Sequence, residues 1–154
     1  MPQISVHSPV GDLTLFEHDG RIVALEWGWV EDQEETPVLV EARRQLEDYF
    51  AGDRRDFDLP LDPAGGTAFQ NKVWAAMRAI PCGQVRTYGD LATELGSSAR
   101  AVGTACGRNP LPILIPCHRV VAASGRLGGY SGWEGTDTKK RLLALEGAAL
   151  PTLV

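Results

Sequence analysis

The chain has 154 residues, of which 44% are hydrophobic and 23% charged, so it is long enough to bury a core of its own. No apolar run approaches the roughly 20 residues that a membrane-spanning helix needs, and the first residues lack the pattern of a secretory signal. We therefore expect no membrane association and a cytoplasmic location. The overall net charge of −5 does not by itself favour a nucleic-acid partner.

That charge is unevenly distributed along the chain. Residues 1–66 contain five Lys and Arg against fifteen Asp and Glu, whereas residues 67–154 contain ten against five. A basic second half is typical of a protein that binds nucleic acid. An acidic solubilising half beside a mildly basic one would give the same distribution, so the charge alone leaves both interpretations open.

The first part of the chain predicts a small α/β domain over residues 1–62. Short strands are expected over 3–7, 13–17 and 21–27, and Asp19-Gly20 predicts a hairpin turn between the last two. A helix is expected from Pro37 to about Phe50, because proline is favoured in the first helical turn. Residues 53–66 are rich in Asp, Pro and Gly and are interpreted as a linker into a second domain over 63–154.

The second domain is predicted to be mostly helical. Thr67 and Gln70 match a capping box, and apolar residues follow at helical spacing until Pro81. A second helix is expected from Thr87 to Leu95, because Thr87 and Asp90 fit the capping pattern of a helix start, and a third from Ser97 or Ser98 to about Arg108. Two short helices joined by a tight Gly-Ser turn suggest a helix-turn-helix, although a helical hairpin packed in a core has the same pattern.

The chain has three cysteines, Cys82, Cys106 and Cys117. An odd number without paired spacing argues against a disulfide framework, and there is no C-x-x-C metal motif. We interpret Cys82 and Cys106 as structural residues. Cys117 differs, because Pro116 precedes it and His118 and Arg119 follow it, so a stiff backbone presents the thiol beside a base and a cation.

A reactive cysteine acts through its thiolate, and we expect His118 or Arg119 to raise the thiolate fraction of Cys117. Neighbouring side chains do not point the same way, so His118 is expected to reach Cys117 through a water. A third group should orient the imidazole, and Glu146 is one candidate. The alternative is that Cys117 is a buried structural cysteine, which is common.

The segment IPCHRV, preceded by RNPLPI and followed by GGYSG, closely resembles the active-site motif of the 6-O-alkylguanine-DNA alkyltransferases, also called methylated-DNA–protein-cysteine methyltransferases. The resemblance extends over about residues 67–147 and includes FQNKVW, IPCGQVRTYGDLA and ARAVGTACGRNP. It implies a ribonuclease-H-like α/β N-terminal domain, with a small antiparallel sheet plus a helix, followed by a mostly α C-terminal domain with a winged helix-turn-helix. The N-terminal third contains no diagnostic motif.

The same resemblance implies a role for individual residues. Cys117 would accept the alkyl group, His118 would activate it through water, and Glu146 would lie behind the imidazole. Asn109 would support the loop that carries the thiol, and Tyr88 would hydrogen-bond the departing guanine. Substrate binding would involve Val120, Tyr130, Ser131, Gly132 and Trp133, with the Ser131 N–H directed at the alkylated oxygen.

DNA contacts are implied for the start of the third helix and for nearby residues. Arg100 would enter the space left by a flipped nucleotide, and the other contacts would come from Thr87, Ser98, Ala99, Ala101, Arg108 and Arg119. The segment from Tyr130 to Glu146 is slightly longer than in the family. The chain also lacks the N-terminal cysteines that hold zinc in some relatives, so no metal and no cofactor are expected.

The predicted function is single-turnover transfer of methyl or larger alkyl groups from the exocyclic oxygen of guanine, and of thymine, to Cys117. The expected partner is double-stranded DNA carrying alkylated guanine, bound by a monomer that is associated with the nucleoid. A soft thiolate suits displacement at a saturated carbon, and no residue in the sequence suggests reversal of the thioether. The alternatives are a non-catalytic lesion-binding protein and a turnover Cys-His hydrolase.

Overall fold

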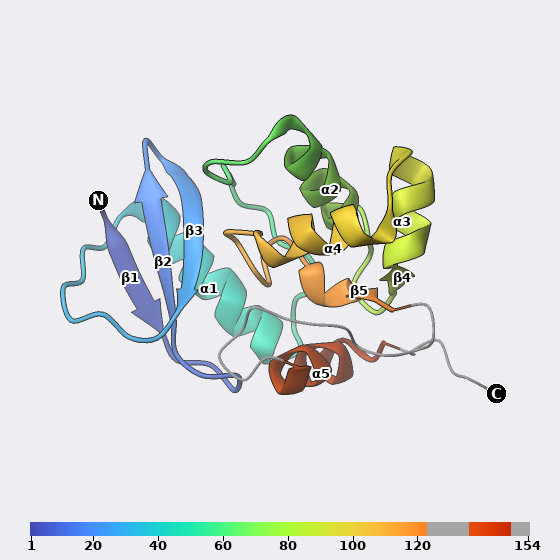
Figure 1. Cartoon of the computed structure of the whole chain (residues 1–154). Coiled ribbons are helices and arrows are strands. Elements are labelled where there is room, and N and C mark those ends of the chain that lie inside the picture. Colours follow the sequence, from blue (N-terminus) through green and yellow to red (C-terminus); the bar gives the residue numbers. More distant parts are fainter. Residues whose placement is uncertain (123–135, 149–154) are drawn as a thin grey trace.

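The structure is a computed structural model that describes residues 1–122 and 136–148 (Figure 1). Its elements follow one another as β1 (Gln3–Val6), β2 (Leu13–His18), β3 (Arg21–Trp27), α1 (Pro37–Phe50), α2 (Ala68–Arg78), β4 (Arg86–Thr87), α3 (Tyr88–Leu95), α4 (Ala99–Gly107), the 3-10 helix η1 (Cys117–Arg119), β5 (Val120–Val121) and α5 (Thr136–Glu146). None of the described helices has the length and apolar character needed to cross a membrane.

The first half of the chain is an antiparallel sheet in the order β1-β2-β3, with α1 packed against it (Figure 1). The turn between β2 and β3 places Asp19 at φ 50° and Gly20 at φ 77°. Two successive positive φ values are the geometry that an Asp-Gly pair favours in a two-residue hairpin. The hairpin and the helix bounds were therefore predicted correctly from local sequence.

The segment after α1 packs against the sheet of the first half. Leu59 and Leu61 are buried, and Leu61 forms an isolated parallel bridge with Ile22 of β3. Ile22 N donates to Pro60 O at 2.8 Å, and Asp62 N donates to Ile22 O at 2.9 Å. Two leucines among the polar residues are enough to pack this segment beside the sheet, so residues 59–62 pack with the N-terminal half.

The second half contains α2, α3 and α4, and both predicted capping boxes are present. Thr67 caps α2 with Gln70, and Thr87 caps α3 with Asp90. Gly96 ends α3 in the left-handed region at φ 64°, which allows the tight turn into α4. The predicted helix-turn-helix is thus α3 and α4. The predicted wing would follow β5 and lies outside the described residues.

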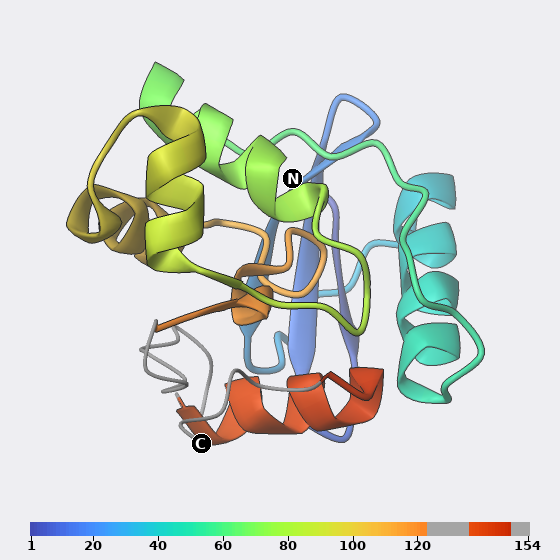
Figure 2. The ribbon, with the colours of Figure 1, turned by 90° about the vertical axis from the view of Figure 1, so that its right-hand side faces the viewer.

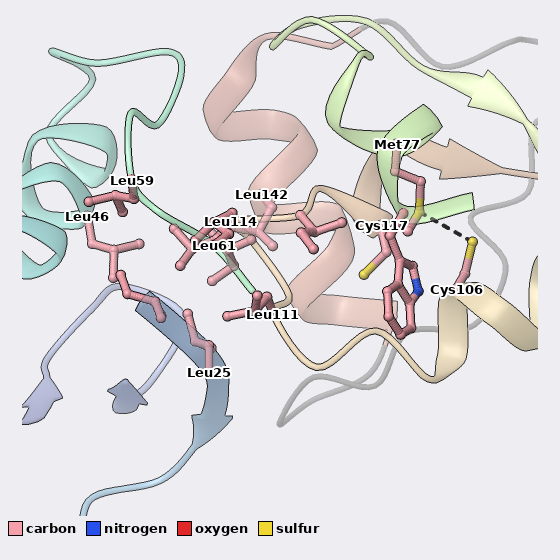
Figure 3. Packing of buried hydrophobic residues seen from close by; sticks show 14 of the residues in the cluster. Leu25, Leu46, Leu59, Leu61, Met77, Cys106, Leu111, Leu114, Cys117 and Leu142 are labelled. Carbon is pink, nitrogen blue, oxygen red and sulfur yellow. Dashed lines mark hydrogen bonds between the residues drawn. The ribbon is translucent and has the colours of Figure 1, made fainter. Parts of the chain in front are cut away.

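One hydrophobic core connects the two halves (Figure 3). Leucines of the first half meet the loop before η1, whose Leu111 and Leu114 lie between them and the Met77, Cys106 and Cys117 group. A backbone hydrogen bond of 2.9 Å from Leu25 N to Pro110 O ties β3 to the same loop. The N-terminal sheet therefore supports the segment that leads to Cys117.

Candidate active site

The loop that leads to Cys117 is held by the side chain of Asn109, which is 6% exposed. Leu111 N donates to Asn109 Oδ1 at 2.9 Å, and Asn109 Nδ2 donates to Ile115 O at 2.8 Å. At its end Cys117 N donates to Ile115 O at 2.8 Å around Pro116, which has φ −80° and ψ 68°. These values define an inverse γ-turn, so the backbone of the nucleophile is fixed on both sides.

The middle of this loop contains an unusual backbone conformation. Ile113 has φ 74°, a region that a β-branched residue rarely adopts. Its side chain is 1% exposed, so burial in the core holds it there. Such conformations cost roughly 1–3 kcal/mol and persist only where the surroundings impose them. The strained residue lies four positions before Cys117, which indicates that the loop shape is imposed by its packing.

The thiol of Cys117 is only 4% exposed. Burial raises its pKa above the ordinary value, while the Asn109 side chain and the Lys139 ammonium act in the opposite direction. The largest of these effects is burial, which favours the neutral thiol. Formation of a thiolate here would require a base to take the proton.

That base is available in His118, which is completely buried. His118 Nε2 lies 2.7 Å from Glu146 Oε2. Burial opposes ionisation of Glu146, but hydrogen bonds from His118 and Arg119 outweigh it and hold the Glu146 pKa well below its usual range. Because Glu146 is a carboxylate and can only accept, Nε2 of His118 must carry the proton in this pair.

The other ring nitrogen of His118 is consequently a free base. Nδ1 is buried and has no hydrogen-bond partner within the described part of the chain. Burial lowers the pKa of His118, and the contact with Glu146 opposes that shift. A neutral imidazole with an unprotonated, unshared nitrogen is suited to accept the proton of a neighbouring thiol.

Arg119 does not lie where the prediction placed it. It is 6% exposed, and its Nε and Nη2 donate to the two oxygens of Glu146 at 2.9 and 3.0 Å. Its Nη1 donates to Ile80 O at 2.7 Å. A guanidinium buried in this way cannot reach a DNA phosphate, so the predicted DNA contact of Arg119 is wrong. It balances the charge of Glu146 instead.

Lys139 is a site residue that the sequence analysis missed. It is fully buried, and its Nζ donates to the Tyr88 hydroxyl at 3.3 Å and lies 5.5 Å from the centre of that ring. Burial lowers the pKa of Lys139 to about 8 and raises that of Tyr88 to about 12. Lys139 precedes Leu142, Leu143 and Glu146 at helical spacing, and that spacing was the available sign that it faces inward.

The residues predicted to bind DNA are mostly at the surface. Ser98, Ala99 and Arg100 are exposed at the start of α4, where Ser98 Oγ accepts from Ala101 N at 3.1 Å. Arg108 is exposed at the opposite end of the helix, Ala101 is half-buried, and Thr87 is half-buried as the cap of α3.

Of the residues predicted to bind the substrate, only Val120 lies within the part of the chain that the structure describes. Val120 is fully buried in β5, which pairs in parallel with β4. Its partner in β4 is Arg86, and Thr87 and Tyr88 follow Arg86 in the chain. Tyr130, Ser131, Gly132 and Trp133 lie outside the described residues and stay predictions. Among the described residues, five of the predicted site residues lie close together: Cys117, Asn109, His118, Glu146 and Tyr88. Arg119 and Lys139 contact this group.

Comparison with protein-family models gives two matches. Residues 68–148 match the DNA-binding domain of 6-O-methylguanine DNA methyltransferase, and residues 3–63 match its ribonuclease-like domain. A constitutive methylated-DNA–protein-cysteine methyltransferase of Bacillus subtilis is 44% identical over 155 residues, which covers 92% of this chain and 93% of that protein. A methylated-DNA–protein-cysteine methyltransferase of Methanosarcina acetivorans is 50% identical over 122 residues, covering 78% and 74%.

Solved structures give the same result. The OGT protein of Mycobacterium tuberculosis, solved in complex with DNA, superimposes with a TM-score of 0.85 at 41% identity and covers 96% of this chain and 93% of its own. An O6-methylguanine methyltransferase structure from the same organism gives a TM-score of 0.82 at 38% identity, with coverage of 95% and 92%.

Proposed function

Because this chain belongs to the 6-O-methylguanine DNA methyltransferase family, we propose that it repairs DNA by moving alkyl groups from guanine to Cys117. The observation that carries the proposal is a buried thiol followed in the chain by a histidine whose Nε2 is held by a carboxylate and whose Nδ1 has no hydrogen-bond partner among the described residues. An activated nucleophile requires a base that is itself oriented by a third group.

The reaction begins with the proton of Cys117. His118 Nδ1 takes it through a bridging water, and the positive charge of Lys139 stabilises the thiolate that forms. The sulfur then attacks the alkyl carbon, a C–S bond forms, and the bond from that carbon to the exocyclic oxygen breaks. The guanine leaves as an anion, and the proton that the thiol gave up restores its neutral form.

Tyr88 has a defined part in this departure. Its hydroxyl accepts a hydrogen bond from Lys139, so its own proton is free to point toward the guanine ring. With a pKa raised to about 12 by burial, Tyr88 stays protonated and can stabilise the developing negative charge. The same chemistry applies to the exocyclic oxygen of alkylated thymine.

Double-stranded DNA that carries alkylated guanine is the proposed partner. The exposed start of α4, with Arg100, supports DNA binding, as does the relative solved in complex with DNA. The alkylated oxygen of a stacked base is hard to reach, so the nucleotide must rotate out of the duplex. We propose that Arg100 occupies the space it leaves and that a monomer in the cytoplasm carries out the repair.

Mass spectrometry after incubation with DNA containing methylated guanine tests the proposal. We expect one methyl group per molecule on the peptide that contains Cys117, and none on the peptides that contain Cys82 or Cys106, which serve as internal controls. Cys117→Ser should abolish transfer and retain DNA binding. Transfer that survives in this variant would overturn the assignment of the nucleophile.

The same experiment separates the two alternatives. Tight binding without any adduct would indicate a lesion-binding protein, which the presence of Cys117 argues against. Continuous release of product by unmodified protein would indicate a hydrolase. A thioether has no hydrolysable linkage, so the proposed reaction stops after one event for each molecule.

A further inference from the structure

Glu146 accepts a third donor from a distant part of the chain. The Tyr49 hydroxyl donates to Glu146 Oε2 at 2.5 Å, across 97 positions of sequence. Tyr49 lies in the last turn of α1, and both ribbon views show this end of α1 beside α5 (Figures 1 and 2). The oxygen that holds His118 is therefore also held by the N-terminal half of the molecule.

We propose that Tyr49 is a positioning residue for alkyl transfer, whose hydroxyl orients Glu146 and lowers the basicity of His118. The inference rests on the proposed function of His118 as the base. Tyr49 does not touch the reacting atoms, so any effect on the reaction passes through the carboxylate.

The geometry explains why one hydroxyl has this influence. Tyr49, His118 and Arg119 all donate to the single atom Oε2, at 2.5, 2.7 and 3.0 Å. Donors that share one oxygen compete for its negative charge. The hydrogen bond from Tyr49 therefore weakens the stabilisation that Oε2 gives to a protonated His118 imidazole. The hydroxyl cannot ionise in the working range, because burial raises the Tyr49 pKa far above its ordinary value.

Other titratable groups also affect the pKa values of Tyr49, Glu146 and His118, and their effects can be separated from that of the Tyr49 hydroxyl. In the described residues they come from η1 (Arg119, Cys117), from the turn after α2 (Cys82) and from α5 (Lys139). Burial raises the pKa of Cys82. Burial lowers the pKa of Lys139 to about 8, so its ionisation belongs to the alkaline side of a pH profile, whereas the lowered pKa of His118 belongs to the acid side.

Tyr49→Phe removes the hydroxyl and keeps the ring, which packs against Phe57 with centroids 5.2 Å apart. Loss of the donor should raise the pKa of His118 by up to about 1 unit, since a hydrogen bond to a charged group corresponds to about 1–2 pKa units and the imidazole feels only part of it. An imidazole that is protonated cannot accept the thiol proton. In the pH profile of the transfer rate, the acid limb should therefore move to higher pH, and the alkaline limb should not move.

The matched control is Ser5→Ala, which removes a buried hydrogen bond of 2.8 Å to Thr14 in the same half of the chain. It should lower stability without moving either limb. If Tyr49 only packs the two halves together, Tyr49→Phe will behave as Ser5→Ala does, and the proposal is overturned.

A ¹⁵N NMR titration of His118 tests the same coupling without DNA. We expect a proton on Nε2 in the wild-type protein and a higher titration midpoint in Tyr49→Phe. Because no substrate is used, this result stands even if Cys117 proves not to accept an alkyl group. Should Tyr49→Phe fail to fold, a fluorinated tyrosine at this position, a stronger donor, should shift the midpoint downward. An unchanged midpoint in the variant that folds contradicts the proposal.

Discussion

Two effects act in opposite directions on the pKa of Cys117. Burial favours the neutral thiol, while the Lys139 ammonium and the Asn109 amide favour the thiolate. A protein that reacts once with each thiol benefits from this balance, because a standing thiolate is open to oxidation and to reaction with other electrophiles. In the proposed reaction the thiol becomes a strong nucleophile only when His118 accepts its proton.

Lys139 should therefore control the rate of transfer. Lys139→Met removes a positive charge that lowers the Cys117 pKa, and we expect transfer at neutral pH to slow about tenfold, equivalent to about one pKa unit. Single-turnover kinetics with methylated-guanine DNA measures this rate. Lys140→Met is the matched control, because Lys140 is an exposed neighbour. Equal rates for both variants would exclude an electrostatic role for Lys139.

At the scale of the elements, helix α4 combines a buried face with an exposed start. Val102, Ala105 and Cys106 are buried, and Cys106 Sγ lies 3.5 Å from Met77 Sδ in the core (Figure 3). The Trp74 indole donates to Ala105 O at 2.9 Å, which holds the helix against α2. The start of α4 is left exposed with Arg100. The buried face thus fixes the position of Arg100 at the surface.

Arg100→Ala should slow repair of duplex DNA by at least about tenfold, because eversion of a paired base costs a few kcal/mol. Reaction with the free modified base should not change, since no eversion is needed. Arg78→Ala, at an exposed arginine in the last turn of α2, serves as the control. Comparison of the two substrates with each variant gives the measurement, and equal slowing on both would remove the flipping role.

At the scale of the whole molecule, the acceptor site depends on both halves of the chain. β3 is hydrogen-bonded to the thiol loop through Leu25 and Pro110, and α1 reaches Glu146 through Tyr49. Glu146 in turn pairs with Arg119, and both residues are buried. Removing one partner of such a pair leaves the other charge buried and uncompensated.

Glu146→Gln should accordingly lower the free energy of unfolding by about 3 kcal/mol at neutral pH. The folded pKa of Glu146 lies below its ordinary value of 4.5, so its stabilising contribution is present above that pH and is lost as the pH falls further. The difference from the wild-type protein should therefore shrink below about pH 4.5. Urea denaturation over a pH series measures it, with the exposed Glu47→Gln as control; a difference independent of pH would contradict the assignment.

The sequence by itself determined the elements whose causes are local. Thr67 with Gln70, Thr87 with Asp90, Asp19 with Gly20, and Pro37 each act within one turn of the chain, so their patterns predicted helix starts and a hairpin that the structure contains. Cys117 was likewise identified from its immediate neighbours and from the family motif.

Only the tertiary structure decided which charged and polar side chains are inside. Arg119 and Lys139 have the composition of surface residues, and Tyr49 is one apolar position of an amphipathic helix, yet all three are buried around Cys117, His118 and Glu146. The burial of each depends on partners 27 to 97 positions away, such as Glu146 for Arg119 and for Tyr49. Helical spacing indicates that Lys139 faces inward, but it does not identify the partners of Lys139, Arg119 or Tyr49, because tertiary packing brings these pairs together.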